Sequence, residues 1–327
     1  IPVEEKYGYW NISKSVIGHI RDNGDGLRVR LSENFFWEAG DSIYLTLSNI
    51  EKHAGIHSSY SFSGIGSQKY NARAKVDSIL GNMDVKSLPI YDSNFKYADN
   101  SGNVRLAVLK TLAKYKGKMT SISYEVQLAD ALSRLYISEL SIKKRYFEEV
   151  VLKLPDSSKN QFLKAYRNQN YARGTEKLGA EALGQSQWYF KYIQSEVQLM
   201  SYFLFGKVNI SWIYNELVKQ QYELVRDRAI LYTLTNNKAQ QDSQQLYRQI
   251  KSIVRDKECL LTLKKIDETA SGRRFTNFAL PDVNGKLVRF SDFKGKVVLI
   301  DFWGAGCGAC RVFFANALSK SEHLFKD

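Results

Sequence analysis

The stretch "VVLIDFWGAGCGACR" (297–311) decides how the C-terminal part of this sequence folds. Its first seven residues form a nearly continuous apolar run, which is typical of a strand buried on both faces of an α/β sheet. A short glycine-containing connection follows, and a helical pattern begins at Cys307 and Cys310. The order strand, loop and helix therefore predicts an α/β fold for this segment.

The two cysteines stand where a helix is expected to begin, and this position favours thiol chemistry. Unpaired backbone N–H groups and the positive end of the helix dipole stabilise a thiolate and lower its pKa. Two intervening residues let the second thiol reach the first and close a disulfide, or resolve a mixed one. We interpret Cys307 as the attacking thiol and Cys310 as the resolving thiol.

Asp301 lies inside the apolar run, where a carboxylate is unexpected. If Asp301 is buried, its pKa rises, and the carboxylate is suited to accept a proton from the resolving thiol. The alternative is that Asp301 ends the strand and is solvated. We favour the buried interpretation because apolar Phe302 and Trp303 follow.

A short hairpin is expected just upstream of the apolar run. The segment "FTNFALPDVNGKLVRFSDFKGK" (275–296) places Asn284-Gly285 between two short extended stretches, and this dipeptide is a strong hairpin-turn signal. Together with the cysteine pair, these features resemble the start of a thioredoxin-fold domain of the TlpA/ResA type, related to AhpC/TSA proteins. The matching elements are "F-x-L-x-D-x-x-G-K-x-V" (278–288), "SDFKGKVVLIDFW" and "CGACR".

The resemblance implies an extracytoplasmic thiol-disulfide oxidoreductase that needs no cofactor. It implies Cys307, Cys310 and Asp301 as catalytic residues, and we take three neighbours as residues that shape the site: Trp303, Gly308 and Ala309. The implied partners are cysteine-containing exported proteins and an upstream electron donor. The region before residue 271 looks like the β-then-helical extension that precedes such domains in Bacteroidota proteins.

The sequence departs from the family pattern at several positions. Gly306 and Ala309 stand where the family usually has Trp and Pro, and Ala315 replaces a proline that commonly bends the active-site helix. The redox potential of this pair therefore does not transfer from a relative. The family also has later strands and a cis-proline loop, whereas the last proline here is Pro281. We therefore expect residues 271–327 to be the N-terminal part of such a domain.

The preceding sequence predicts two further regions, and so a multidomain α+β protein. Residues 1–102 form a β-rich domain, because "LRVRL" (27–31) and "SIYLTL" (42–47) alternate apolar and other residues. "DNGDG" (22–26) lacks the spacing of calcium ligands and is interpreted as a hairpin turn. Residues 103–270 are all-helical, with apolar side chains three or four positions apart. The aromatic run 188–192 is interpreted as helix core rather than a ligand site.

Charge and composition exclude some classes of protein. The net charge is +13, but the basic residues are scattered among acidic ones, so we expect no nucleic-acid binding. No stretch is long and apolar enough to span a membrane, and the N-terminal residues lack the features of a secretory signal. We expect a periplasmic or cell-envelope protein whose signal is not part of this sequence, and peripheral or lipid-anchored membrane association is compatible with this.

Three functions stay open at this point. The leading hypothesis is a reductant or isomerase of exported proteins that uses the Cys307–Cys310 dithiol. The second is a non-enzymatic extracytoplasmic binding module with an incomplete or vestigial redox domain. The third is a zinc site, for which Cys259 and His323 are poorly placed, and we interpret Cys259 as a small buried residue. A peroxidase is excluded because no Pro-x-x-x-Thr-x-x-Cys pattern is present.

Overall fold

The computed structural model describes most of the chain, namely residues 6–16, 27–48, 59–82, 91–92, 95, 101–168, 175, 177–237, 243–268, 276–304 and 307–318. The predicted turn at 22–26 lies outside these residues, as does His323, which was considered above as a zinc ligand. The chain divides into two compact units, one of residues 1–12 and 31–265 and one of residues 13–30 and 266–327. Each unit is described by itself below.

Two hairpins occupy the first part of the chain, formed by β1 (Tyr7–Val16) with β2 (Leu27–Glu38) and by β3 (Ser42–Ser48) with β4 (Ser59–Ile65). The strands predicted at 27–31 and 42–47 are therefore confirmed. β3 and β4 run antiparallel and place Leu45 opposite Phe62. The alternation has its usual cause, since the inward side chains of β3 pack against a small aromatic core of Phe35, Phe62 and Tyr70.

The expectation that the first 102 residues are mostly strands is wrong at residues 67–81, because α1 (Ser67–Gly81) is a helix. Its buried positions include 69, 72, 73 and 76, which follow helical spacing. Two of these buried positions carry Lys69 and Arg73, so a search for apolar residues alone does not detect the helix. The fold is accordingly more helical than we predicted.

Helices make up nearly all of the described residues from 102 to 268, as the sequence predicts. They are α2 (Gly102–Ala113), α3 (Ser121–Glu149), the 3-10 turn η1 (Val151–Lys153), α4 (Asp156–Asn168), α5 (Ala180–Gln185), α6 (Tyr189–Phe205), α7 (Ile210–Leu217), α8 (Glu223–Asn236), α9 (Ser243–Ile253) and α10 (Lys257–Glu268). Ser101 precedes α2 as its N-cap residue.

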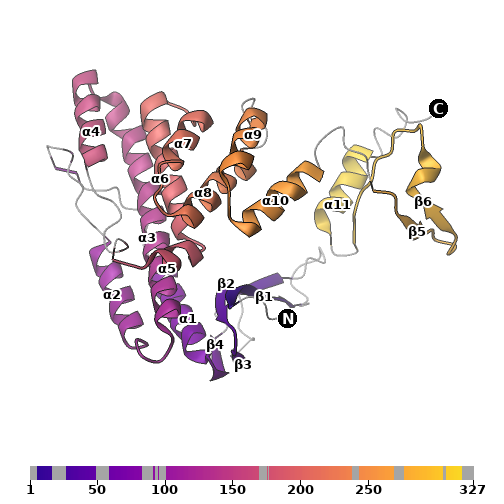
Figure 1. The fold of residues 1–327 in the computed structure, drawn as a ribbon, viewed down its shortest axis with the longest axis horizontal. Coiled ribbons are helices and arrows are strands. Elements are labelled where there is room, and N and C mark those ends of the chain that lie inside the picture. Colours follow the sequence, from indigo (N-terminus) through magenta and orange to yellow (C-terminus); the bar gives the residue numbers. More distant parts are fainter. Residues whose placement is uncertain are drawn as a thin grey trace. The chain divides into compact units, whose positions relative to one another are not determined.

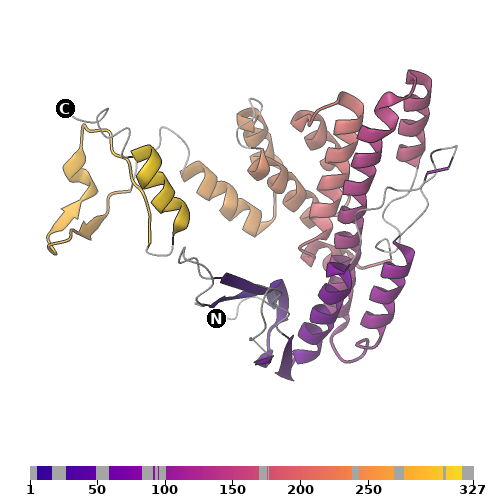
Figure 2. The same cartoon turned by 180° about the vertical axis from the view of Figure 1, so that it is seen from behind.

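The longest helix, α3, forms the centre of this region. Thr120 caps it by accepting a hydrogen bond from the backbone N–H of Ser123 at 3.1 Å. Figures 1 and 2 both show α6 lying beside α3, and the two helices pack through a largely aromatic core. Tyr189 and Tyr192 belong to this core, in agreement with our interpretation of the aromatic run 188–192 as helix core.

The C-terminal unit contains a short hairpin and a short helix. β5 (Ala279–Pro281) pairs antiparallel with β6 (Leu287–Arg289), followed by the 3-10 turn η2 (Phe290–Phe293), α11 (Gly308–Phe313) and the π-helical turn η3 (Phe314–Leu318). The predicted hairpin at Asn284-Gly285 is confirmed. Gly285 has a φ of +80°, a left-handed conformation that glycine adopts without the cost of a Cβ.

The strand predicted at 297–303 is not present, since these residues adopt no regular structure. A strand is defined by hydrogen bonds to a neighbouring strand, and no described segment pairs with 297–303. The apolar run is consequently exposed rather than buried on two faces. In the described part of the chain, no helix is both long and apolar enough to cross a membrane.

Candidate functional site

The hairpin before the cysteines is held by the side chain of Asp282. Its carboxylate accepts hydrogen bonds from the backbone N–H groups of Asn284 and Lys286, each at 2.9 Å. An aspartate that bonds to the backbone two residues later forms an Asx turn, which explains why the turn occurs at this point of the sequence. The rings of Phe278 and Phe290 then stack across the base of the hairpin at 5.4 Å.

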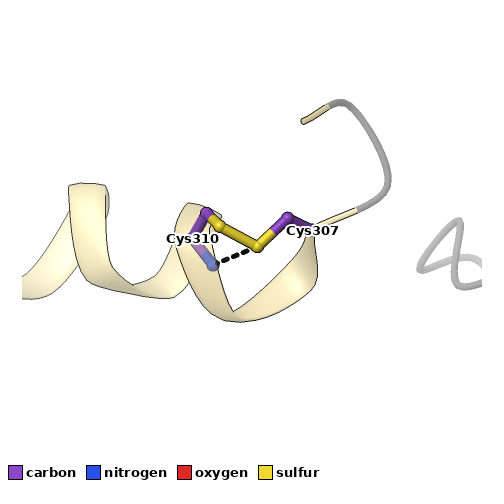
Figure 3. The surroundings of a disulfide bond; sticks show 2 residues. All are labelled: Cys307 and Cys310. Carbon is purple, nitrogen blue, oxygen red and sulfur yellow. Dashed lines mark hydrogen bonds between the residues drawn. A yellow bond between two sulfur atoms is a disulfide. The ribbon is translucent and has the colours of Figure 1, made fainter. Parts of the chain in front are cut away.

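Cys307 and Cys310 meet at the beginning of α11 and form a disulfide (Figure 3). Their Cα atoms are 5.3 Å apart, and both residues are partly exposed. Cys307 is the N-cap residue of α11, and its Sγ accepts a hydrogen bond from the backbone N–H of Cys310 at 3.1 Å. The structure therefore brings the two predicted thiols into bonding distance at a helix start.

This geometry has a consequence for the reduced pair. The N–H group that points at the Cys307 sulfur would also stabilise a thiolate on the same atom. No such donor to the Cys310 sulfur is found among the described residues. The two sulfurs therefore differ in their hydrogen bonding, although both lie near the surface.

Gly308 and Ala309 occupy the first turn of α11 between the two cysteines. Ala309 is exposed, and neither residue carries a functional group. Trp303 is 69% exposed, and its ring meets that of Phe314 edge-on at a centroid distance of 6.0 Å. Trp303 therefore contacts the helical segment that follows the cysteines.

Asp301 is exposed, contrary to our interpretation of it as a buried carboxylate. The physical reason is the one given for the missing strand: with no neighbouring strand beside 297–303, nothing covers the side chains of this segment. Within the described residues, no hydrogen bond or ion pair joins Asp301 to another group. The burial on which its predicted role as proton acceptor depends is absent from this structure.

Cys259 is separate from this pair and has a different environment. It is buried in α10, as predicted, with 3% of its surface exposed. Burial raises the pKa of its thiol far above the usual value, and a hydrogen bond to Asp256 adds to this effect. Cys259 is therefore a poor nucleophile. No group of three or more metal-ligating side chains occurs among the described residues.

Our sequence analysis missed a network of buried charges in the N-terminal unit. The carboxylate of Asp130 accepts hydrogen bonds from Ser186 Oγ at 2.6 Å, the backbone N–H of Trp188 at 3.2 Å and the Tyr9 hydroxyl at 3.2 Å. Arg73 lies 3.4 Å from the same carboxylate and 2.7 Å from Asp77. Arg73 and Asp77 have opposite charges and stand four residues apart, which is the spacing of an ion pair on a helix. This spacing is the sequence signal that could have indicated part of the network.

The Cys307–Cys310 pair and a partial similarity to known proteins together suggest a thioredoxin-like redox segment at the C-terminal end. The chain is 37% identical over 58 residues to the thiol-disulfide oxidoreductase ResA of Bacillus subtilis (strain 168), a match that covers 18% of this chain and 32% of the relative. It is 39% identical over 46 residues to the thiol-disulfide oxidoreductases ResA of Bacillus thuringiensis subsp. konkukian (strain 97-27) and of Bacillus cereus (strain ATCC 10987 / NRS 248). Each of these matches covers 14% of this chain and 27% of the relative.

The chain thus spans less than a third of the length of these relatives. No known family profile matches the chain. No solved structure is significantly similar to it. The similarity to these relatives therefore covers at most 18% of this chain.

Proposed function

We propose that this protein is a thiol-disulfide oxidoreductase that reduces or isomerises disulfides of exported proteins through Cys307 and Cys310. The observation that carries the proposal is the meeting of the two sulfurs at the start of α11, with the Cys310 N–H donating to the Cys307 sulfur. The partial similarity to ResA proteins supports it. A location in the periplasm or cell envelope belongs to the same proposal.

The reaction consists of two thiol-disulfide exchanges. The Cys307 thiolate attacks one sulfur of a client disulfide, the client S–S bond breaks, and the second client sulfur leaves as a thiolate. The Cys310 thiolate then attacks the Cys307 sulfur, which releases the first client sulfur and forms the Cys307–Cys310 disulfide. Two electrons pass to the client, and a dithiol electron donor restores the reduced pair. In isomerisation a client thiolate instead attacks the client sulfur of the mixed disulfide, which forms a new client disulfide and releases Cys307 as a thiolate.

Asp301 is the proposed proton acceptor for the Cys310 thiol. An exposed carboxylate serves this step only if the protein buries it when the redox segment engages a client, because burial is what raises its proton affinity. Trp303, Gly308 and Ala309 shape the surface next to the reacting sulfurs in this proposal.

Trapping of a mixed disulfide tests the order of the two thiols. The Cys310→Ser variant should accumulate a covalent adduct with a disulfide-containing model peptide, because nothing resolves it. The Cys307→Ser variant should form much less adduct, and Cys259→Ser should turn over like the parent chain. Mass spectrometry of the unreduced products measures the adducts. Equal trapping by Cys307→Ser would contradict the proposed roles.

The alternative function is a non-enzymatic extracytoplasmic binding module. It is favoured by the folded N-terminal unit, in which no described residue takes part in the thiol chemistry. A redox titration against glutathione separates the two functions. A reversible two-electron Cys307–Cys310 couple with client turnover supports the enzyme, whereas a pair that stays oxidised and inert supports the binding module.

A further inference from the structure

A cleft of about 470 Å³ lies within the N-terminal unit, in the size range of roughly 300–1,000 Å³ that is usual for ligand sites. Side chains of β1, β2, α6, α8 and α10 and of the residues that directly precede α6 and α10 line it. The helices are labelled in Figure 1. This cleft shares no residue with the cysteine pair, and no function has been assigned to it above.

Part of the cleft lining is polar. Arg228 lines it from α8 and donates one guanidinium N–H to the backbone carbonyl of Gly184 at 2.6 Å. Gln187 lies three residues after Gly184, and it receives a hydrogen bond from Asn34 at 2.6 Å and donates its backbone N–H to the Tyr9 hydroxyl at 3.3 Å. Hydrogen bonds therefore join Asn34, Gln187 and Tyr9 to one another, and Arg228 lines the same cleft.

Another part of the lining is apolar, although the charged Lys191 and Glu258 also line the cleft. Arg228, Leu231 and Tyr232 are spaced by three and four residues and so lie on one face of α8, with Leu231 and Tyr232 about one turn beyond the arginine. The Tyr232 ring meets the Phe190 ring of α6 edge-on at 5.8 Å. An aromatic and aliphatic wall thus begins next to the guanidinium.

Arg228 makes no ion pair with a carboxylate in the described part of the chain. Its neighbour Asp227 is paired with Arg226 at 2.8 Å. Asp256 accepts the backbone N–H of Cys259 at 2.9 Å and is engaged in capping α10. The remaining donors of a half-exposed guanidinium match a carboxylate, which binds such a group through two parallel hydrogen bonds.

We propose that this cleft binds a carboxylate attached to an apolar or aromatic body. The carboxylate pairs with Arg228, the side-chain amide of Gln187 belongs to the same lining, and the body packs against Phe190, Leu231 and Tyr232. Two kinds of ligand have such a carboxylate, namely a free small acid and the C-terminal residue of a peptide. The inference stands apart from the thiol chemistry and does not depend on it.

Calorimetric titration of the full chain with four probes tests the proposal. The probes are 3-phenylpropionate, the isosteric 3-phenylpropionamide, the peptide Ala-Ala-Ala-Phe and the same peptide with an amidated C-terminus. At least one acid should bind about tenfold or more tightly than its amide, since a charge-assisted pair is lost in the amide. Binding of the small acid alone identifies a free acid as the source, and binding of the peptide acid identifies a C-terminus.

Matched variants locate the binding. Arg228→Gln should abolish the difference between acid and amide, whereas Arg248→Gln, at an exposed position of α9 that does not line the cleft, should keep it. Tyr232→Ala leaves the guanidinium in place and should weaken the acid about fivefold or more through the lost aromatic contact. It therefore provides a second test if Arg228→Gln folds poorly by circular dichroism.

Three outcomes overturn the proposal. They are equal binding of acid and amide, an acid preference that survives Arg228→Gln, and no binding of any probe up to about 10 mM, where even a weak site near −3 kcal/mol would be detected. Replacement of both Cys307 and Cys310 by Ser should leave the binding unchanged, so failure of the proposed redox function does not affect this result.

Discussion

At the scale of single residues, the three cysteines of this chain differ because their surroundings differ. Cys307 and Cys310 are partly exposed, and a backbone N–H donates to the Cys307 sulfur. Cys259 is enclosed in α10, where burial acts against its thiolate. The reactivity of each thiol should follow from these environments.

Brief alkylation of the reduced protein should therefore label Cys307 first and Cys259 last. The thiolate is the reacting form, so the stabilised sulfur reacts fastest and the buried one reacts slowest. Peptide mass mapping after short exposure to iodoacetamide measures the order, and a urea-denatured sample in which all three cysteines react is the control. First labelling of Cys310 or Cys259 would reverse the assignment.

Asp130 is the most enclosed member of the buried charge network, and it carries a second prediction. Burial raises the pKa of this carboxyl group, while Arg73 and the hydrogen bonds from Ser186, Trp188 and Tyr9 oppose the shift. Asp130→Asn removes one of the two carboxylate partners of Arg73, the other being Asp77, and turns an amide N–H₂ toward groups that donate. We expect the free energy of unfolding to fall by about 3 kcal/mol, as for other broken buried pairs.

Urea denaturation followed by circular dichroism measures this change. The matched control is Asp156→Asn at the start of α4, where the side chain is 93% exposed and the change should stay within about 0.5 kcal/mol. A loss of the same small size in both variants would show that the network adds little to stability.

At the scale of elements, ion pairs tie α1 to α3. Asp77 of α1 pairs with Arg73 of its own helix at 2.7 Å and with Arg134 of α3. Burial acts to raise the pKa of Asp77, but the two guanidinium groups outweigh it and hold that pKa below its usual value. Charged side chains therefore join these helices in addition to an apolar cluster that includes Val76 of α1 and Ala131 of α3.

The Asp77 pKa shift predicts a loss of stability in acid. A carboxyl group whose folded-state pKa is depressed stabilises the fold above its unfolded pKa of about 3.9, and the contribution disappears as the pH falls through the lower folded value. Asp77→Asn should lose this contribution at neutral pH and flatten the stability profile below about pH 4.

Thermal melts of both proteins between about pH 2.5 and pH 7 provide the measurement, since acid protonation of a paired carboxylate is read directly in such a profile. The two curves should converge toward the acid end. Parallel curves over the whole range would mean that Asp77 does not titrate between the folded and unfolded states as described.

The same comparison of elements explains the mistaken strand at 297–303. A buried parallel strand is recognised by an apolar run, but it forms only when neighbouring strands supply its hydrogen bonds. Here the run is apolar and without a partner strand in the described residues, so Asp301 is exposed together with it. The local composition was interpreted correctly, while its pairing depended on other segments.

At the scale of the whole molecule, the N-terminal unit contains its own cores and should fold without the redox segment. Its hairpins and helices enclose several clusters of buried side chains. The C-terminal unit is shorter, and most of its described residues are exposed. A chain truncated after Ser271 should melt in one cooperative transition close to that of the full chain.

Differential scanning calorimetry of the two chains makes this measurement, with calorimetric and van't Hoff enthalpies compared for cooperativity. A broad, non-cooperative melt of the truncated chain, or insolubility relieved only by restoring residues 272–327, would show that the two units depend on each other for folding.

The sequence by itself determined the local features of this protein. It located the strands β2 and β3, the hairpin of β5 and β6, the helices from residue 103 onward, the buried Cys259 and the cysteine pair at the start of α11, because each depends on neighbouring residues and on the spacing of apolar side chains. A Cys-x-x-Cys at a helix start is similarly a local motif, and its chemistry follows from the helix itself.

Only the tertiary structure decided the features that join distant segments. The buried charges of α1, the Asp130 network and the cleft beside Arg228 each combine residues that are far apart in the chain, and in each a polar or charged side chain is held by partners from other elements. A single sequence does not show which charges are compensated by such partners. A buried charge is stable only when such partners are present. For this reason these features could be identified from the tertiary structure but not from the sequence.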